Sequence, residues 1–369
     1  MPTEFEFIFS GLSALEIEGN LRQILDAALA EKYGANPDDL ILKRIAEEWA
    51  AMERTNAICD VAALYELTKW LKKNRHPYWL RGCAGSSFIL YLLGITSGNP
   101  LSAHYYCPHC QAVQWQPLYA DGFDLPQDAV CPKDKTSFLP DGHDIAWQIL
   151  LGFGDFSPTF DIDLPSDLYE GVRDKWTSHW LKTIDPSNVP ANPYEGKRQC
   201  IKISKLSLMF HLDRSEISNT FYNHEYTAAD REYMLLKWKL LIGSEAYFTT
   251  DSLAPDRVAD LISLFGLGHS AGAWDELTAC MLEEMGYSPA DMIAYRDDVY
   301  RYLIDHGFLE KDAWTGMNRV RMGRDLPVIT DEMRRARDKW VLSRCERIGY
   351  LFPKSHAVEY MLFMLKSLS

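Results

Sequence analysis

The segment LRGCAGSSF at residues 80–88, followed at a distance by DIDL at residues 161–164, decides how this sequence is interpreted. The first segment is a glycine- and serine-rich turn that precedes an apolar run at residues 88–93. Glycines let backbone amides approach a phosphate, serines add hydroxyl donors, and a helix N-terminus after them favours an anion. A turn of this kind before an apolar run is also a common structural feature, so the motif alone does not establish nucleotide binding.

The two carboxylates of the second segment, Asp161 and Asp163, are two positions apart. On a strand they share one face, because successive side chains point to opposite sides. Two carboxylates on one face can hold Mg²⁺ or Mn²⁺, which take oxygen ligands from the protein and from substrate phosphates. The alternative interpretation is a solvated loop, since paired acidic residues are common at surfaces.

A cysteine cluster lies between these motifs. Cys107 and Cys110 form one CxxC unit, and Cys131 with Asp134 repeats its spacing further along. Paired knuckles at this separation are typical of a zinc ribbon, and a carboxylate is an acceptable fourth zinc ligand. His104 and His109 are spare candidates. The alternative is a decayed site with free thiols; in either case a structural role is expected, not a catalytic one.

Basic residues are scattered near the C-terminus. Arg319, Arg321, Arg324, Lys354 and His356 could clamp a triphosphate or template phosphates. A solvated helix face is the alternative for such a set.

Composition limits the classes of function. The chain has 369 residues, enough for two or three packed subdomains, and 47% of them are hydrophobic. Its net charge of −14 argues against a protein that coats nucleic acid over its whole surface, although a local basic groove remains compatible. There is no long apolar run, and no basic segment precedes the N-terminal apolar stretch. A cytoplasmic protein without a membrane partner is therefore expected.

Hydrophobic periodicity predicts mostly helical structure at both ends of the chain. Residues 11–75 and 255–369 have helical spacing, and a further helix is predicted at residues 169–182. Residues 199–212 alternate as a strand does.

Taken together and in order, these motifs resemble the catalytic subunit of bacterial DNA polymerase III of the PolC type, a family C DNA polymerase. Further matches accompany them at residues 31–34, 99–101, 122–126, 141–145, 152–153, 266–270 with Trp274, 296–298, 320–324 and 352–356.

The resemblance implies an α+β fold with a nucleotidyltransferase-like palm, a helical fingers domain and a small zinc-ribbon insertion. Residues 1–75 would form the N-terminal helical part of the palm, and residues 76–215 the palm core. Within that core, the insertion would occupy about 104–137 and a vestigial thumb about 165–195. Residues 216–369 would form the fingers.

The same resemblance implies roles for individual residues. Asp161 and Asp163 would hold the catalytic Mg²⁺ or Mn²⁺ ions, while Zn²⁺ at Cys107, Cys110, Cys131 and Asp134 would be structural. The nucleotide-binding residues would be Arg81, Gly82, Gly85, Ser86, Ser87, Arg321, Arg324, Lys354 and His356. The substrates would be primer–template DNA and a deoxynucleoside triphosphate.

Departures from the family pattern qualify this expectation. The family carries a third catalytic aspartate in a Lys-Leu-Asp-Ile-Leu-Gly-His pattern, and the matching segment here, residues 205–211, has Ser207 at that position. The stretch between Asp163 and Lys205 is too short for the family's thumb, and the clamp-binding region is expected to be absent. A weak or inactive DNA-directed DNA polymerase is therefore predicted. The alternative is a catalytically dead paralogue, a pseudoenzyme that binds nucleotide, DNA or a replisome protein as a regulator or decoy in DNA replication.

Overall fold

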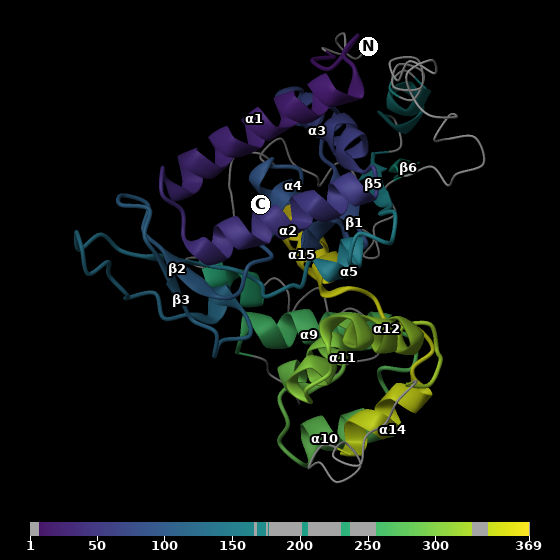
Figure 1. Cartoon of the computed structure of the whole chain (residues 1–369). Helices are drawn as coiled ribbons and strands as arrows, with labels where there is room; N and C mark the ends of the chain where they lie inside the picture. Colours follow the sequence, from purple (N-terminus) through teal and green to yellow (C-terminus); the bar gives the residue numbers. More distant parts are fainter. Residues whose placement is uncertain are drawn as a thin grey trace.

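The computed structural model of the protein describes residues 7–165, 168–174, 176, 201–205, 230–236, 256–326 and 339–368. The predicted α+β class is confirmed, because many helices surround two small three-stranded sheets (Figure 1). Ser207 and most of the expected thumb, residues 165–195, lie outside the described residues.

Three helices form the N-terminal part of the chain, as the periodicity predicts. They are α1 (Ala14–Tyr33), α2 (Asp39–Arg54) and α3 (Ile58–Lys73). The side chain of Ser13 caps α1 and that of Asp38 caps α2, each accepting a hydrogen bond from an early backbone N–H of its helix. Lys72 and Lys73 lie in the last turn of α3, where the helix dipole favours cations.

The central sheet has the order β1-β5-β6, with β1 at Trp79–Arg81, β5 at Phe160–Leu164 and β6 at Ile201–Lys205. Strand β5 pairs antiparallel with β1 and parallel with β6. Because side chains alternate along a strand, Leu80 and Ile162 enter the core formed with α1–α3, and the neighbouring residues face the opposite side. Trp79 belongs to the other core, which the C-terminal helices build.

A second sheet has the order β3-β2-β4 and projects to one side of the molecule (Figure 1). Its strands are β2 (His104–Tyr106), β3 (Val113–Trp115) and β4 (Leu139–Asp141). A small core of its own, which includes Tyr105 and Phe138, supports this sheet.

The C-terminal part is helical. The described residues include the helices α9 (Val258–His269), α10 (Glu276–Glu283), α11 (Arg296–Asp305), α12 (Glu310–Val320), α14 (Lys339–Arg347) and α15 (Lys354–Leu368). Helix α15 returns to the central sheet, where it packs against β1 and the short helix η1 (Ala84–Ser86). Further short helices in the described part of the chain include α4 (Phe88–Leu92), η2 (Gly122–Asp124), α5 (Gln148–Leu151) and η5 (Pro289–Asp291).

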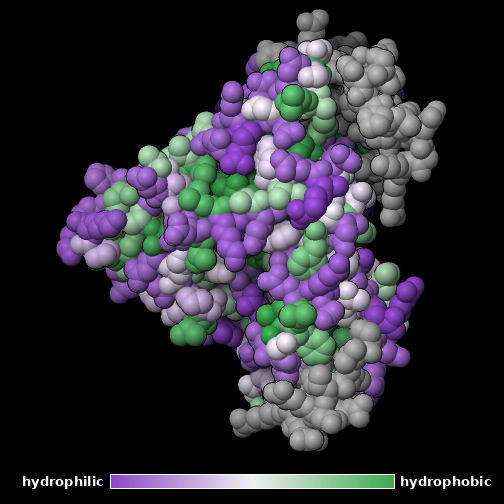
Figure 2. Space-filling view, viewed as in Figure 1, coloured by the Kyte–Doolittle hydropathy of each residue, from purple (hydrophilic) through white to green (hydrophobic). Residues whose placement is uncertain are grey.

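The visible surface is mainly hydrophilic, with a strip of hydrophobic residues between α1 and α2 (Figure 2). Within the described ranges, none of the helices combines the length and the apolar character that crossing a bilayer requires.

Candidate active site and metal cluster

The two acidic residues Asp161 and Asp163 lie on the face of strand β5 that packs toward the C-terminal helices. Asp161 is half-buried and Asp163 is only 3% exposed. Residues directly opposite on paired strands share a face, and Asp163 is paired with Trp79, which contributes to the C-terminal core. The two carboxylates therefore lie in the central strand of the sheet and not in a solvated loop.

Arg81 supplies the positive charge nearest to these carboxylates. Its Nε lies 3.2 Å from Oδ1 of Asp163, and its backbone is paired with Asp161 in the sheet. The arginine thus lies on the same face as both acids. This donor set fits divalent-cation binding, because carboxylates on one rigid strand are hard oxygen ligands with a fixed separation.

The hydroxyl groups of Ser86 and Ser87 are bonded within the protein. Ser86 Oγ donates to Ser355 Oγ at 3.1 Å, and Ser87 Oγ donates to Glu48 Oε2 at 2.7 Å. Both serines are fully buried. The structure therefore brings them to α15 and α2, respectively, and not to the β5 carboxylates.

Glu48 of α2 anchors the turn that contains these serines. Besides the Ser87 hydroxyl, its carboxylate accepts hydrogen bonds from the backbone N–H groups of Phe88 at 3.0 Å and Ile89 at 3.2 Å. Arg44 forms an ion pair with Glu48 and also donates to the carbonyls of Ser86 and Ile145. An internal carboxylate thus occupies the start of α4, where an external anion would otherwise be favoured.

The two glycines of the turn are needed for different reasons. Gly82 has a φ of 76°, a conformation that other residues rarely adopt. Gly85 lies against α15, and a Cβ atom there would come within 2.9 Å of Glu359 Cγ. A larger side chain at residue 85 would therefore push the turn away from α15.

His356 holds the turn from the C-terminal side. Its Nδ1 accepts a hydrogen bond from the Gly82 N–H at 3.0 Å, and its ring packs against Trp79. Burial, with further contributions from His269, Arg81 and Arg296, lowers the pKa of His356 to about 3. The imidazole is therefore neutral at physiological pH. It orients the turn through its hydrogen bond and adds no positive charge to the site.

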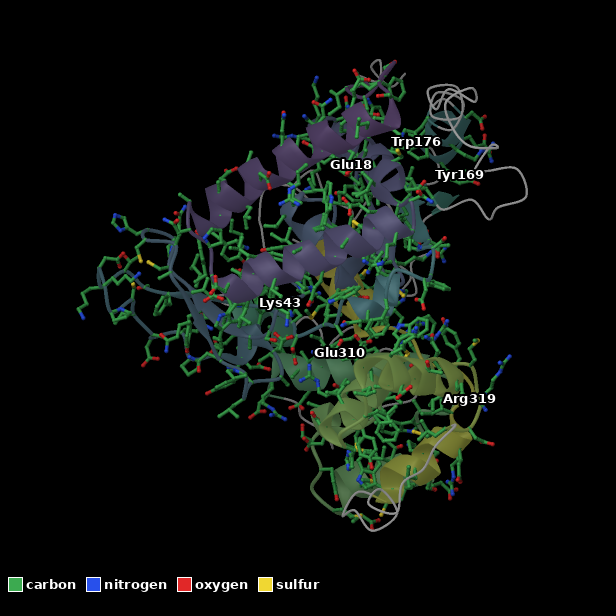
Figure 3. The ribbon with its side chains drawn as sticks, in the orientation of Figure 1. Glu18, Lys43, Tyr169, Trp176, Glu310 and Arg319 are labelled. Carbon is green, nitrogen blue, oxygen red and sulfur yellow. The ribbon has the colours of Figure 1, made fainter. Side chains whose placement is uncertain are left out.

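The remaining predicted cations do not converge on one point. Lys354 Nζ donates to the carbonyls of Ala120 and His143, away from β5. Arg324 is exposed, and Arg319 extends from α12 at the outer edge of the C-terminal helices (Figure 3). Arg321 is half-buried, and burial together with the neighbouring Arg296 lowers its pKa.

Cys83 and Arg296 belong to the site although the sequence patterns assigned them no role. Burial raises the pKa of the Cys83 thiol, which also interacts electrostatically with Arg296, Arg321 and Asp161. Arg296 Nη1 lies 3.5 Å from the Cys83 sulfur, and its other end donates to the Leu351 carbonyl. The thiol therefore lies within electrostatic reach of Asp161 on β5 and of Arg296 and Arg321 from the C-terminal helices. The only sequence signal for Arg296 was its position in the RDD motif at residues 296–298.

The second sheet brings the predicted metal ligands together. Ligand atoms of Cys107, Cys110, Cys131 and Asp134 all lie within 4.8 Å of one another. Asp134 also contacts His109 Nδ1 at 3.0 Å. His104 lies apart from this group, in contact with the Ser102 carbonyl.

The two halves of this cluster have the same backbone geometry. Gln111 and Lys135, each directly after the second ligand of its half, have φ values of 59° and 65°. Their N–H groups donate to the carbonyls of Cys107 and Cys131, respectively. Three sulfurs and one carboxylate at this separation fit a tetrahedral metal site.

Comparison with known proteins confirms the resemblance that the motifs indicate. The family described as "Bacterial DNA polymerase III alpha NTPase domain" matches residues 19–181. The DNA polymerase III PolC-type of Streptococcus agalactiae serotype III is 25% identical, covering 95% of this chain and 32% of the relative. Those of Clostridium perfringens and Mycoplasma genitalium are each 24% identical, covering 90% of this chain and 30% of the relative. The chain thus spans about a third of the length of the curated relatives that it matches.

Proposed function

On the premise of this similarity to PolC-type polymerases, we propose that the chain is a nucleotidyltransferase module that transfers a deoxynucleotide to a primer 3′-hydroxyl. The observation that carries the proposal is the placement of Asp161 and Asp163 on one face of β5, beside Arg81. This arrangement combines acceptors for divalent cations with donors for phosphate oxygens.

The reaction joins the primer 3′-oxygen to the α-phosphorus of the nucleotide and breaks the bond between that phosphorus and the bridging oxygen. Pyrophosphate leaves, and the hydroxyl proton passes to solvent. Two divalent ions, when bound, lower the pKa of the attacking hydroxyl and neutralise phosphate charge. Asp161 and Asp163 would hold those ions.

The surrounding residues of the chain position the substrate. Arg81, Arg321 and Arg324 would donate to the oxygens of the triphosphate. Gly82, Gly85, Ser86 and Ser87 act by holding the turn in place, since their bonds run to α15 and α2. His356 supports the same turn, and Lys354 supports the loops of residues 120 and 143.

The proposed domains follow the sequence boundaries. Residues 76–215 form the palm, residues 1–75 its helical support and residues 216–369 the fingers, which α15 joins to the palm. The cluster of Cys107, Cys110, Cys131 and Asp134 would bind Zn²⁺ in a ribbon-like insertion, with a purely structural role.

Turnover in this module is expected to be slow. Ser207 replaces the third carboxylate, and the loss of one such electrostatic contact costs about 3–4 kcal/mol in the transition state. The match to the streptococcal relative spans 470 residues although this chain has 369, which is the pattern that a shortened thumb would produce. Weak duplex binding would follow from a shortened thumb.

The second candidate function is that of a catalytically dead relative that binds nucleotide or DNA, or regulates a replisome. Ser207 and the net charge of −14 favour it. The two candidates differ in turnover but share the cation site.

Mn²⁺ binding tests that shared site. Titration of the protein with Mn²⁺, followed by electron paramagnetic resonance, should give binding that tightens when a deoxynucleoside triphosphate is present. The double variant Asp161→Ala/Asp163→Ala should lose this nucleotide-linked binding. Retention of the binding by the double variant would refute the assignment of β5 as the cation site.

A further inference from the structure

A cavity of about 360 Å³ lies between the loop that follows β3 and the helices α9 and α11 (Figure 1). Its wall includes Tyr119 from that loop, Ser263 from α9 and several side chains of α11. Asp161, Asp163 and Arg81 do not take part in it, so the cavity is distinct from the proposed active site. Its volume is within the range of small-molecule sites in proteins.

The side chains around this cavity carry an excess of negative charge. The charged residues of its wall are four acids and two bases, namely Asp144, Asp297, Asp298, Asp305, Arg301 and Lys354. Arg301 and Asp144 form an ion pair, so these two charges compensate each other. Lys354 then stands against three acids of α11, and its Nζ donates to the carbonyls of Ala120 and His143. The cavity therefore favours a cation.

Asp297 carries a buried oxygen that lacks a partner. The residue is 8% exposed, and its Oδ2 accepts a hydrogen bond from the Lys354 N–H at 2.8 Å. Its Oδ1 has no hydrogen-bond partner within the described part of the protein. An unsatisfied buried acceptor costs free energy, so such an atom in a cavity wall indicates that a donor binds there. Burial raises the pKa of Asp297 despite the nearby charges of Arg296 and Lys354, so the protein itself leaves this carboxylate incompletely compensated.

Two more acids extend the negative charge along α11. Asp298 uses one oxygen, Oδ2, to accept hydrogen bonds from the N–H groups of Ala294 at 2.9 Å and Tyr295 at 2.7 Å. Asp305 is exposed at the other end of the helix, and its carboxylate makes no hydrogen bond or ion pair with any other described residue. At a rise of 1.5 Å per residue, Asp298 and Asp305 are about 10 Å apart along the helix axis.

This spread of carboxylates does not suit a single metal ion. A metal ion needs several ligand atoms around one point. Among the residues that the structure describes, the group of three or more candidate ligands that meets this condition is the cluster of Cys107, Cys110, Cys131 and Asp134. Acids separated along a helix instead fit a ligand whose positive charges are separated by a similar distance.

Hydrophobic side chains accompany the acids in the wall. Leu118, Tyr119 and Ile304 all line the cavity. Leu118 is 97% exposed and Tyr119 is 39% exposed, so their surfaces are available to a ligand. Aliphatic carbon would be buried against these side chains, and a tyrosine ring also attracts an ammonium group.

We propose that this cavity, named here the α11 cavity, binds a linear aliphatic polyamine. One terminal ammonium group donates to Asp297 Oδ1 and to the Asp298 carboxylate, and the other pairs with Asp305. The methylene groups between them contact Tyr119 and Ile304. The ligand also adjoins the start of α15, because the Asp297 carboxylate holds the Lys354 N–H.

The test is isothermal titration calorimetry of the full chain with spermidine, in physiological salt and without divalent ions or DNA. Saturable binding is expected. Asp297→Asn and Asp305→Asn should each weaken it about ten-fold, because each removes the charged partner of one ammonium group. Asp312→Asn, at an exposed acid in the first turn of α12, should leave it unchanged. Thermal denaturation establishes that each variant is folded, and the exposed Asp305→Asn decides alone if Asp297→Asn does not fold.

A ligand series tests whether two separated ammonium groups are bound. Diaminooctane should bind more tightly than putrescine, which has the same charge on a shorter chain. It should also bind more tightly than octylamine, which has the same chain but a single ammonium group. Equal binding of diaminooctane and octylamine would overturn the arrangement, since it would show that the second ammonium group has no partner.

Three further outcomes would overturn the proposal. They are no saturable binding of spermidine, full binding by the folded variants at residues 297 and 305, and displacement of spermidine by an equal concentration of Mg²⁺, which would identify a metal site. Asp161→Ala/Asp163→Ala should bind spermidine as the wild type does. The assignment of the palm and the assignment of the α11 cavity can therefore fail separately.

Discussion

The backbone N–H of Gly82 donates a hydrogen bond to Nδ1 of His356 at 3.0 Å, joining the glycine–serine turn to the first turn of α15. Ser355 strengthens the same junction, because its hydroxyl donates to the Gly82 carbonyl at 3.0 Å. Residues far apart in the sequence thus fix the turn next to the β5 carboxylates. Because Nδ1 must accept this bond, the junction requires a neutral imidazole.

Acid should weaken this junction. The pKa of His356 is about 3 in the folded protein against an ordinary 6.5, so between these values the unfolded state binds the extra proton. The neutral His356 contributes its full share of stability above pH 6.5, and this share is lost as the pH falls toward 3. At pH 5 the loss in the free energy of unfolding is about 2 kcal/mol. Urea denaturation at pH 7.5 and 5 should show this loss in the wild type.

His356→Gln removes the titrating group and should reduce the difference between the two pH values by that amount. His306→Gln, at the half-buried histidine that ends α11, is the matched control and should retain the wild-type difference. An unchanged pH dependence in His356→Gln would mean that the histidine is not buried as a neutral group.

Glu48→Ala should destabilise the protein strongly. The substitution leaves the Ser87 hydroxyl, two backbone N–H groups and Arg44 without their acceptor, and breaking a buried ion pair costs about 3–5 kcal/mol. Glu47→Ala removes a 42% exposed carboxylate from the same helix and should cost under about 1 kcal/mol. Equal losses in the two variants, by urea denaturation, would show that Glu48 does not anchor the turn.

Arg81→Gln should tighten Mn²⁺ binding at the palm a few-fold. The Arg81 guanidinium neutralises Asp163, and its removal leaves that carboxylate to attract a cation. Arg22→Gln, which removes an arginine of α1 whose side chain is 42% exposed, should leave the affinity unchanged. Weaker Mn²⁺ binding by Arg81→Gln in electron paramagnetic resonance titrations would contradict this role.

Asp134→Cys should retain Zn²⁺ longer against a chelator, because a fourth thiolate completes a set of four sulfur ligands. Asp134→Ala should release the metal faster than the wild type. Asp128→Ala, an exposed residue of the same insertion, serves as control. If the metal content of the purified protein were negligible, or if the three variants released it at the same rate, the cluster would not be a zinc site.

The features predictable from the sequence are those with a local signature. Alternation placed Asp161 and Asp163 on one face of a strand, and ligand spacing brought Cys107, Cys110, Cys131 and Asp134 together. The position of the two acids follows from the alternation of side chains along one strand. The metal-ligand cluster follows from two similar ligand pairs that must come together to complete one site.

Features that depend on distant packing were not predictable. The bonds from Ser87 to Glu48 and from Ser86 to Ser355 decide where those hydroxyls point, and no pattern within residues 80–88 reveals them. Lys354 and His356 are only two residues apart, but their side chains contact different parts of the protein. Lys354 donates to the His143 carbonyl near the second sheet, and His356 accepts from the glycine–serine turn. Burial likewise makes His356 neutral, whereas residue type alone suggested a cation.

Primer extension with Mg²⁺ and with Mn²⁺ tests the central claim most directly, comparing the wild type with Asp161→Ala/Asp163→Ala and Ser207→Asp. The proposed function predicts slow extension by the wild type, none by the alanine variant and faster extension by Ser207→Asp. Extension only by Ser207→Asp would identify an inactive relative with an otherwise intact site. No extension by any of the three would contradict the account and favour a binding role.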